Sequence, residues 1–442
     1  MAQSSPGQAL PLKQNMNKLT RQAIVAGILG NALEWYDFAL YGHFSVFIGK
    51  TFFPSEQPDL ALLAAFAVFS VSFCMRPIGA LIFSAMGDRY GRKRALSLSM
   101  LGMAIPTAGI GLLPPYADIG VAATAILVIL RLFQGLSLGG EMGGAVTYVM
   151  EHTPPERTGF ASALIQASTC GGLLLGSLIS GGLSLMLTDA AFNDWGWRVP
   201  FILGLVAAGI GIRIRRDMPE SALYELARSE ERLLRNPVRT LFLSHKQPLV
   251  LAIALLAPMT CCFFLIFVYF NSFMMAELHL PASQALLLTS LALTLSLLAT
   301  LLGGWWADRL GYRRVLATGV GTALLAVLPV MSTLATGWTD AGTWPALFGF
   351  ALLIGLYTSP VFAAVASLFP TEIRYSGVSF AVNIASPLFG STVPLLATWV
   401  IHRQGAAAGF TSLGVYIMVL FGLAGIALYQ IWSGERGVRV EG

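Results

Sequence analysis

Long apolar runs separated by short polar segments dominate this sequence. Each run is long enough for a helix that crosses a bilayer, which takes about 20 residues. The pattern predicts an all-α membrane protein with twelve transmembrane helices. The predicted spans are 22–48, 60–86, 94–113, 119–147, 160–187, 197–214, 247–276, 283–306, 314–334, 343–367, 376–401 and 409–432.

The distribution of basic residues predicts how these spans are oriented in the membrane. With the N-terminus on the inner side, nearly all of the 27 lysines and arginines fall on inner segments. Such an excess of positive charge is typical of cytoplasmic loops, so we expect both termini in the cytoplasm. The predicted parts are a cytoplasmic N-terminus (1–21), a six-helix bundle (22–214), a cytoplasmic linker (215–246), a second six-helix bundle (247–432) and a cytoplasmic tail (433–442).

Composition supports this class and argues against several others. The chain is 56% hydrophobic and 11% charged, with a mean hydropathy of +0.72, whereas soluble domains carry about 25% charged residues. The basic residues behind the net charge of +5 cluster in short loops between apolar runs, as topology signals do. We therefore expect no nucleic-acid partner. We find no catalytic or metal-binding pattern and predict neither an enzyme nor a cofactor. No soluble segment is large enough for an ATPase, so a gradient must supply any energy.

The two halves of the chain resemble each other. The loop Gly87–Arg94 follows the second span, and the similar loop Ala307–Arg314 follows the eighth at an offset of 220 residues. Similarly, Pro155–Gly159 follows the fourth span and Pro370–Gly377 the tenth. This repeat predicts two pseudo-symmetric halves around a site near the membrane midplane, which is an architecture of secondary transporters.

Five charged residues lie well inside spans of the first half, away from the span ends. Glu34 and Asp37, three residues apart, share one face of the first helix, and Arg76, Arg131 and Glu141 lie in the second and fourth spans. A charge at the bilayer centre costs about 2.5–3.5 kcal/mol on insertion scales, so such residues are functional candidates by default. The alternative is a set of fixed ion pairs that only hold the helices together.

Several motifs resemble known families. The loop Gly87–Arg94 is similar to the cytoplasmic signature of the major facilitator superfamily, and Arg131–Gly140 is similar to its Arg-x-x-Gln-Gly motif. Four further stretches resemble the metabolite–proton symporters of bacterial inner membranes, namely Gly30–Phe38, Met75–Ala80, Gly139–Glu141 and Trp195–Phe201. Known members carry citrate, 2-oxoglutarate, shikimate, or proline and betaine.

The resemblance implies a major facilitator fold and proton-driven uptake across a bacterial inner membrane. Under it, we expect Glu34 or Asp37 to carry the proton, with Glu141 as a second candidate. Arg131 and Arg76 are candidates for contact with the substrate anion. Further polar candidates for the substrate site are Gln166, Tyr269, Asn271, Tyr357 and Asn383; for each, the alternative is hydrogen bonding between helices.

The repeated loops are candidates for a cytoplasmic gate. Their acids can pair with a base or cap a helix N-terminus, which would latch one conformation. The gate candidates are Asp88, Arg89, Arg92, Asp308, Arg309 and Arg313. The alternative is a tight turn with basic residues that only anchor the topology.

The predicted substrate is a small organic anion, citrate, another tricarboxylate or a 2-oxoglutarate-like acid. Two intramembrane arginines favour an anion, and Lys50–Pro54 resembles citrate-carrying relatives. One alternative is a compatible-solute symporter for proline or betaine, although the short tail without heptads counts against it. A second alternative is an exporter of a metabolite, siderophore or drug. We expect a monomeric unit in the lipid bilayer, with protons as the co-substrate.

Overall fold

The computed structural model describes the chain except for residues 1–8, 54–57, 217–219, 235, 271–272, 275–277, 279, 281, 336–342 and 441–442. Every regular element in the described part is helical, which confirms the predicted all-α class. The asparagine at 271, a predicted substrate-site residue, lies outside the described residues.

The N-terminal half holds six long helices and short connecting turns. In chain order, its elements are α1 (Ala9–His43), α2 (Ser45–Phe52), α3 (Pro58–Tyr90), α4 (Arg92–Leu112), α5 (Tyr116–Ile119), α6 (Val121–His152), η1 (Pro155–Arg157), α7 (Thr158–Met186), α8 (Asp189–Asp194), η2 (Gly196–Arg198) and α9 (Val199–Arg216). Two short helices follow in the linker, α10 (Ala222–Ser229) and α11 (Pro237–Ser244).

The C-terminal half repeats this plan with more breaks in its helices. Its elements are α12 (Lys246–Phe264), η3 (Leu265–Tyr269), α14 (Ala282–Leu310), α15 (Tyr312–Ala335), α16 (Thr343–Thr358), α17 (Val361–Ser367), η4 (Thr371–Ile373), α18 (Arg374–Ala385), η5 (Ser386–Ser391) and α19 (Val393–Val440). The turns η3 and η5 are π-helical. Gly405, with φ of 77°, breaks the helical geometry inside α19, between the last two predicted spans.

Nine stretches of the described part are long and apolar enough to cross a membrane. One of them, Thr371–Ser433, covers both of the last two predicted spans. The predicted spans 22–48 and 60–86 are not among the nine. The second lies within α3, whereas the first lies mostly in α1 but was placed too far along the chain, because α1 ends at His43 and α2 follows. The predicted division into parts stays a prediction.

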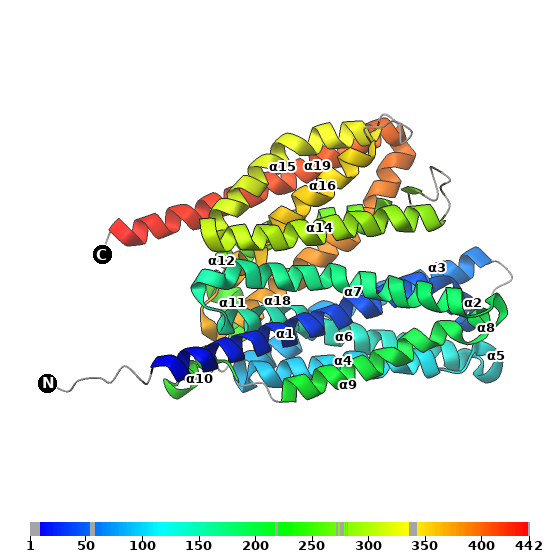
Figure 1. The fold of residues 1–442 in the computed structure, drawn as a ribbon, viewed down its shortest axis with the longest axis horizontal. Coiled ribbons are helices and arrows are strands. Elements are labelled where there is room, and N and C mark those ends of the chain that lie inside the picture. Colours follow the sequence, from blue (N-terminus) through cyan, green and yellow to red (C-terminus); the bar gives the residue numbers. More distant parts are fainter. Residues whose placement is uncertain are drawn as a thin grey trace.

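The halves form two bundles that lie side by side (Figure 1). In Figure 1, α1 begins and α19 ends at the same end of the molecule, which we call the predicted cytoplasmic end. The bundles meet along α7 and α14, and α18 packs against α3 and α6. The candidate site therefore lies where α1, α3 and α6 adjoin the second bundle.

Glycines allow α3 and α6 to approach closely. A Cβ atom on Gly139 would lie 2.2 Å from the carbonyl oxygen of Arg76, and one on Gly135 would lie 2.2 Å from that of Ser72. Small residues at such crossings let helix backbones touch, as membrane helices require in the absence of a hydrophobic driving force between them. This crossing places Arg76 of α3 beside the charged residues of α1 and α6.

In each of the two repeated loops, a glycine with positive φ stands directly before the next helix. Gly91, with φ of 106°, precedes α4, and Gly311, with φ of 88°, precedes α15. Both values lie in the region that residues with a side chain rarely adopt. The shared sequence therefore produces the same sharp turn in each half.

Candidate functional site

The first buried ion pair joins Glu34 of α1 to Arg76 of α3. Arg76 Nη2 lies 2.5 Å from Glu34 Oε1, and both side chains are buried. The Arg76 guanidinium also stacks on the ring of Phe73, 5.1 Å from its centroid. The other oxygen of Glu34, Oε2, is buried and has no hydrogen-bond partner among the described residues. The pair therefore retains one unsatisfied acceptor.

The second buried pair joins Asp37 of α1 to Arg131 of α6. Arg131 Nη1 lies 3.6 Å from Asp37 Oδ2, and its guanidinium lies 4.0 Å from the centre of the Tyr41 ring. Thr107 of α4 donates to Asp37 at 2.8 Å, and the amide of Gln134 donates at 3.1 and 3.2 Å. The structure therefore brings four of the predicted charged residues together as two pairs.

Sequence reasoning missed two of these partners. Gln134 stands three residues after Arg131 and accepts a hydrogen bond from it at 2.8 Å. That spacing, one helical turn inside an apolar span, is the signal that could have found it. Thr107 carried no comparable signal, because a threonine in a membrane helix often bonds only to its own backbone.

Glu141 of α6 is a further buried acid in the middle of this half. It is 1% exposed, and Ser99 Oγ of α4 lies 2.5 Å from its Oε2. Asp37 and Glu141 line the same small cavity. The prediction that Glu141 belongs with the acids of α1 therefore has a geometric basis.

Aromatic side chains from both halves meet beside Glu34. Trp35 packs on Phe38 at 5.3 Å and on Phe263 of α12 at 5.1 Å between ring centres. Phe73 packs on Phe38 at 5.4 Å and on Phe264 at 6.5 Å. We call these five rings the junction cluster. Sequence reasoning missed it, because phenylalanines in apolar spans look like ordinary core residues.

Other predicted residues hold helices together. Tyr357 donates to the backbone oxygen of Leu255 at 2.7 Å, inside the C-terminal half. Tyr269 packs within a group of aromatic rings that includes Phe270. Gln166 of α7 is buried, and its Oε1 has no hydrogen-bond partner. Of these three, Gln166 has an atom left over for a ligand.

Asn383 joins the halves. Its amide donates to the backbone oxygen of Gly139 at 2.9 Å and to that of Ser379 at 2.8 Å. Tyr375, also on α18, donates to the backbone oxygen of Gly140 at 2.8 Å. Asn383 therefore holds α18 against α6, which is the hydrogen bonding between helices that the sequence offered beside a substrate role.

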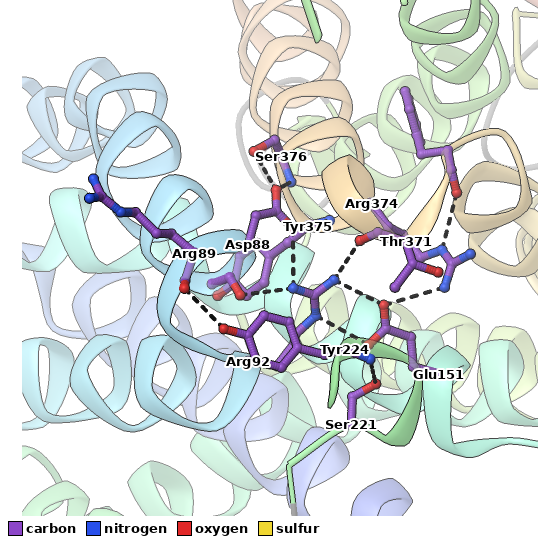
Figure 2. A network of polar contacts seen from close by, with 12 residues as sticks. Asp88, Arg89, Arg92, Glu151, Ser221, Tyr224, Thr371, Arg374, Tyr375 and Ser376 are labelled. Carbon is purple, nitrogen blue, oxygen red and sulfur yellow. Dashed lines mark hydrogen bonds and ion pairs between the residues drawn. The ribbon is translucent and has the colours of Figure 1, made fainter. Parts of the chain in front are cut away.

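Asp88 fastens the predicted cytoplasmic end of α3 to the second half. Its carboxylate accepts the backbone N–H groups of Tyr375 and Ser376 at 3.3 and 2.9 Å, and the Ser376 hydroxyl at 2.6 Å (Figure 2). These N–H groups stand at the start of α18, where a helix carries positive partial charge. The loop of one half thus caps a helix of the other.

Arg92 lies at the centre of this network. Its guanidinium pairs with Glu151 at 3.1 Å and with Asp88 at 3.4 Å, and it donates to the backbone oxygen of Thr371 at 2.7 Å (Figure 2). Arg374 reaches the same Glu151 oxygen at 3.3 Å. Glu151 was not predicted, although an acid at the end of a span is a signal for such a pair. Arg92 and Glu151 are both fully enclosed.

Arg89 points away from this network. Its guanidinium lies over the ring of its neighbour Tyr90 and is exposed, while its backbone oxygen accepts from Tyr224 of α10 at 2.9 Å. Among the described residues, the Arg89 guanidinium makes no hydrogen bond or ion pair with the network around Arg92, because it points away from it (Figure 2), and its part in a gate stays a prediction.

The second loop makes the reciprocal contact with less burial. Asp308 accepts the backbone N–H of Phe160, near the start of α7, at 3.0 Å. Arg309 stacks on Trp305 at 3.6 Å, and Arg313 lies over the ring of Tyr312 at 5.6 Å. Asp308 thus bonds across the two halves, whereas these contacts of both arginines stay within their own half. A gate role for the three residues stays a prediction.

Comparisons with known proteins give the family and the fold. The family described as Major Facilitator Superfamily matches residues 27–390. The proton:xylose symporter XylE, at 16% identity, superposes with a TM-score of 0.75 over 94% of this chain and 96% of its own. This likeness confirms the predicted major facilitator fold.

Closer relatives are named for transport. The ectoine/proline transporter ProP of Corynebacterium glutamicum is 33% identical over 93% of this chain and 84% of its own length. The inner membrane metabolite transport protein YhjE of Escherichia coli is 34% identical over 92% of this chain and 93% of its own. The proline/betaine transporter of Escherichia coli is 31% identical over 87% and 78%. None of these names mentions citrate, 2-oxoglutarate or shikimate, so the predicted organic acid gains no support.

Proposed function

Because this chain belongs to the major facilitator superfamily, we propose that it is a proton-coupled symporter of a small zwitterion of the proline or betaine type. The names of two relatives support this substrate class. The tail lies outside the two bundles, so its length does not count against this substrate class.

The observation that carries the proposal is the contact between the Glu34–Arg76 pair and the junction cluster. Arg76 stacks on Phe73, and Trp35 follows Glu34 directly in α1. A guanidinium binds a carboxylate with a planar fork of donors, and aromatic faces bind quaternary ammonium groups. A zwitterion with one carboxylate and one ammonium group suits both features, which both halves contribute.

An organic polyanion suits this site less well. The two arginines in the middle of the N-terminal half already pair with Glu34 and Asp37. A citrate-like anion would bring several further negative charges into a region of low dielectric, where an uncompensated charge costs several kcal/mol. The junction cluster would also be left without a cationic group to bind.

The ion pairs suggest how a proton is coupled to the substrate. A substrate carboxylate that binds Arg76 competes with Glu34 for the same guanidinium. The released carboxylate then lies buried without its counter-charge, which favours its protonation. Proton and substrate thereby favour each other's binding, and such coupling is reciprocal. Asp37 and Arg131 form a second pair that can respond in the same way.

Transport by reconstituted protein tests the proposal. Proteoliposomes with an acidic exterior should accumulate labelled proline or glycine betaine, and a protonophore should abolish the accumulation. Labelled citrate under the same gradient is the matched probe. Accumulation of citrate alone would refute the substrate class, and accumulation that survives the protonophore would refute proton coupling.

A further inference from the structure

A stripe of side chains along the outside of α3 ends at Arg89. Ile78, Ile82, Ala85 and Arg89 follow one another at intervals of four, three and four residues, so they share one face of the helix. Ile78 and Ile82 are 45% and 50% exposed. Lipid tails are as apolar as these side chains, so the stripe suits a surface in contact with lipid. Arg89 therefore stands where this surface of α3 reaches the predicted cytoplasmic end.

A cavity of about 550 Å³ lies between the end of this stripe and α11 of the linker. Its volume is within the ordinary range of ligand sites. The apolar side chains at its wall include Ile82 and Met86 of α3 and Val238 of α11. Two exposed arginines, Arg89 of α3 and Arg239 of α11, also line it. The cavity therefore joins an apolar wall that continues along α3 to two positive charges.

Neither arginine of the cavity forms an ion pair within the part of the chain that the structure describes. The Arg89 guanidinium lies over the ring of Tyr90, another lining residue, at 5.1 Å, and it points away from the network around Arg92 (Figure 2). In contrast, Arg92 is enclosed between acids. Arg89 and Arg239 thus differ from the arginines of the buried networks, because their charges are left for an anion.

The chemistry of the wall fits a phospholipid. A guanidinium binds a phosphate with two parallel N–H donors, and basic pockets on the cytoplasmic side of membrane helices bind anionic lipid head groups. An acyl chain attached to that phosphate would lie along Ile82 and Ile78, whereas a soluble anion would leave this stripe uncovered. An arginine that only reaches from a helix end to the membrane surface would explain Arg89 alone, not a cavity that a second arginine also lines.

The two sides of the cavity belong to different halves of the molecule. A single residue, His245, separates α11 from α12, the first helix of the second half. Phe242 of α11 also packs on Phe380 of α18, with 5.0 Å between ring centres. On its other side α11 contacts α3. A ligand held by both α3 and α11 therefore bridges the halves at the end where Asp88 caps α18.

We propose that this cavity binds the phosphate of an anionic phospholipid from the leaflet at the predicted cytoplasmic end, and that the bound lipid favours the closed state of that end. A ligand stabilises the state that it binds best, and α3 and α11 adjoin in the closed arrangement. The site lies apart from the junction cluster and does not depend on the proposed substrate.

Lipid titration of the purified full-length protein, followed by native mass spectrometry, tests the site. Arg89→Gln and Arg239→Gln should each weaken the tightest binding of phosphatidylglycerol about fivefold, which is the contribution of one basic residue close to an anionic lipid surface. Arg309→Gln is the matched control, because Arg309 stands 220 residues after Arg89 in the repeat and its guanidinium lies over Trp305; it should bind as the wild type does. Wild-type binding in both cavity variants, or equal weakening in all three, would overturn the proposal.

Two further ligands separate a lipid from a free anion. Phosphatidylcholine, which offers acyl chains without net charge, should bind at least about fivefold more weakly than phosphatidylglycerol. Glycerol 3-phosphate, which offers the phosphate without the chains, should displace little of the bound phosphatidylglycerol at the same concentration. Full displacement would assign the cavity to a soluble anion and refute the lipid.

Electron spin resonance tests the effect on the closed state. With spin labels at Arg94 and Arg314, nanodiscs that contain phosphatidylglycerol should hold a larger share of closed molecules than nanodiscs of phosphatidylcholine alone. Arg239→Gln should abolish this difference. No difference in the wild type, or the same difference in Arg239→Gln, would contradict a lipid that bridges the halves. Because neither measurement uses a transported substrate, failure of the proposed transport function would leave the lipid site standing.

Discussion

The two halves share a fold but differ in chemistry. Among the N-terminal residues whose burial the structure describes, eight acidic and basic ones are buried, namely Glu34, Asp37, Arg76, Asp88, Arg92, Arg131, Glu141 and Glu151. In the described part of the C-terminal half, the buried polar residues are serines, threonines and Asn383, without any buried charge. The same overall helical plan thus encloses an ionic interior in one bundle and, in the described part of the other, an interior without buried charge.

This difference suggests a division of labour. Buried ion pairs fix the positions of α1, α3, α4 and α6, because an unpaired charge in the bundle would be costly. The C-terminal half contributes aromatic rings, two π-helical turns and the start of α18, which Asp88 binds. The proposed proton coupling therefore assigns proton binding to the first half.

The largest expected effect comes from the acid beside Arg131. Asp37→Asn should lower gradient-driven accumulation relative to exchange by at least about a hundredfold, because the amide carries no titrating proton. Tyr357→Phe is the counterpart in the C-terminal half; it removes the hydrogen bond to Leu255 and should leave the ratio unchanged. Proteoliposome uptake measures both. Equal losses in the two variants would contradict the division of labour.

The two loop acids should differ in the next test. Asp88→Asn weakens three charge-assisted hydrogen bonds in a buried site and should destabilise the closed end by about 1.5–3 kcal/mol. Asp308→Asn affects a more exposed carboxylate and should cost less than about 1 kcal/mol. Spin labels placed at the exposed positions Arg94 and Arg314 report the separation of the halves by electron spin resonance. A larger separation of the halves in Asp308→Asn than in Asp88→Asn would contradict this prediction.

A smaller effect is expected at the glycine crossing of α3 and α6. A Cβ atom at Gly139 meets backbone atoms at 2.2 and 2.4 Å, so Gly139→Ala should destabilise the protein by about 1–3 kcal/mol. Gly422 in α19 has no atom within 4 Å of such a Cβ atom, and Gly422→Ala should be neutral or slightly stabilising. Thermal unfolding in detergent measures both. If Gly139→Ala unfolds at the wild-type temperature, α3 and α6 can move apart at this crossing without loss of stability.

The smallest effect concerns the aromatic rings between the halves. Trp35→Ala should raise the KM for glycine betaine several-fold, since a cation–π contact contributes about 0.5–2 kcal/mol. Phe421, which packs on Tyr357 inside the C-terminal half, provides the control Phe421→Leu, with little change in KM expected. Initial uptake rates at several concentrations separate KM from the maximal rate. Unchanged KM in Trp35→Ala would remove the junction cluster from the substrate site.

Much of the candidate site could be predicted from single positions. A charge in an apolar span is conspicuous whatever surrounds it, so Glu34, Asp37, Arg76, Arg131 and Glu141 stood out. Their pairing could not be predicted, because it depends on how α1, α3 and α6 cross. The partners Ser99, Thr107 and Phe263 were not predicted, because serine, threonine and phenylalanine are common in membrane helices.

The residues alone did not determine the substrate. Two arginines favoured an anion, but the structure pairs both with acids. A charge that is already compensated attracts an anion far less than a free one. The named relatives point to proline and betaine instead, which the residues had supported only as an alternative.

The sequence by itself determined where the helices lie, that they cross a membrane and that the two halves repeat. The length of an apolar run and a glycine at a turn act locally along the chain. The sequence also determined which residues carry costly charges. Only the tertiary structure decided which charge meets which, since Arg76 and Arg131 reach α1 from separate helices that are distant in sequence. The same packing decided that Asp37 and Glu141 share a cavity and that Asp88 binds the start of α18, because such contacts form where helices from separate parts of the chain cross.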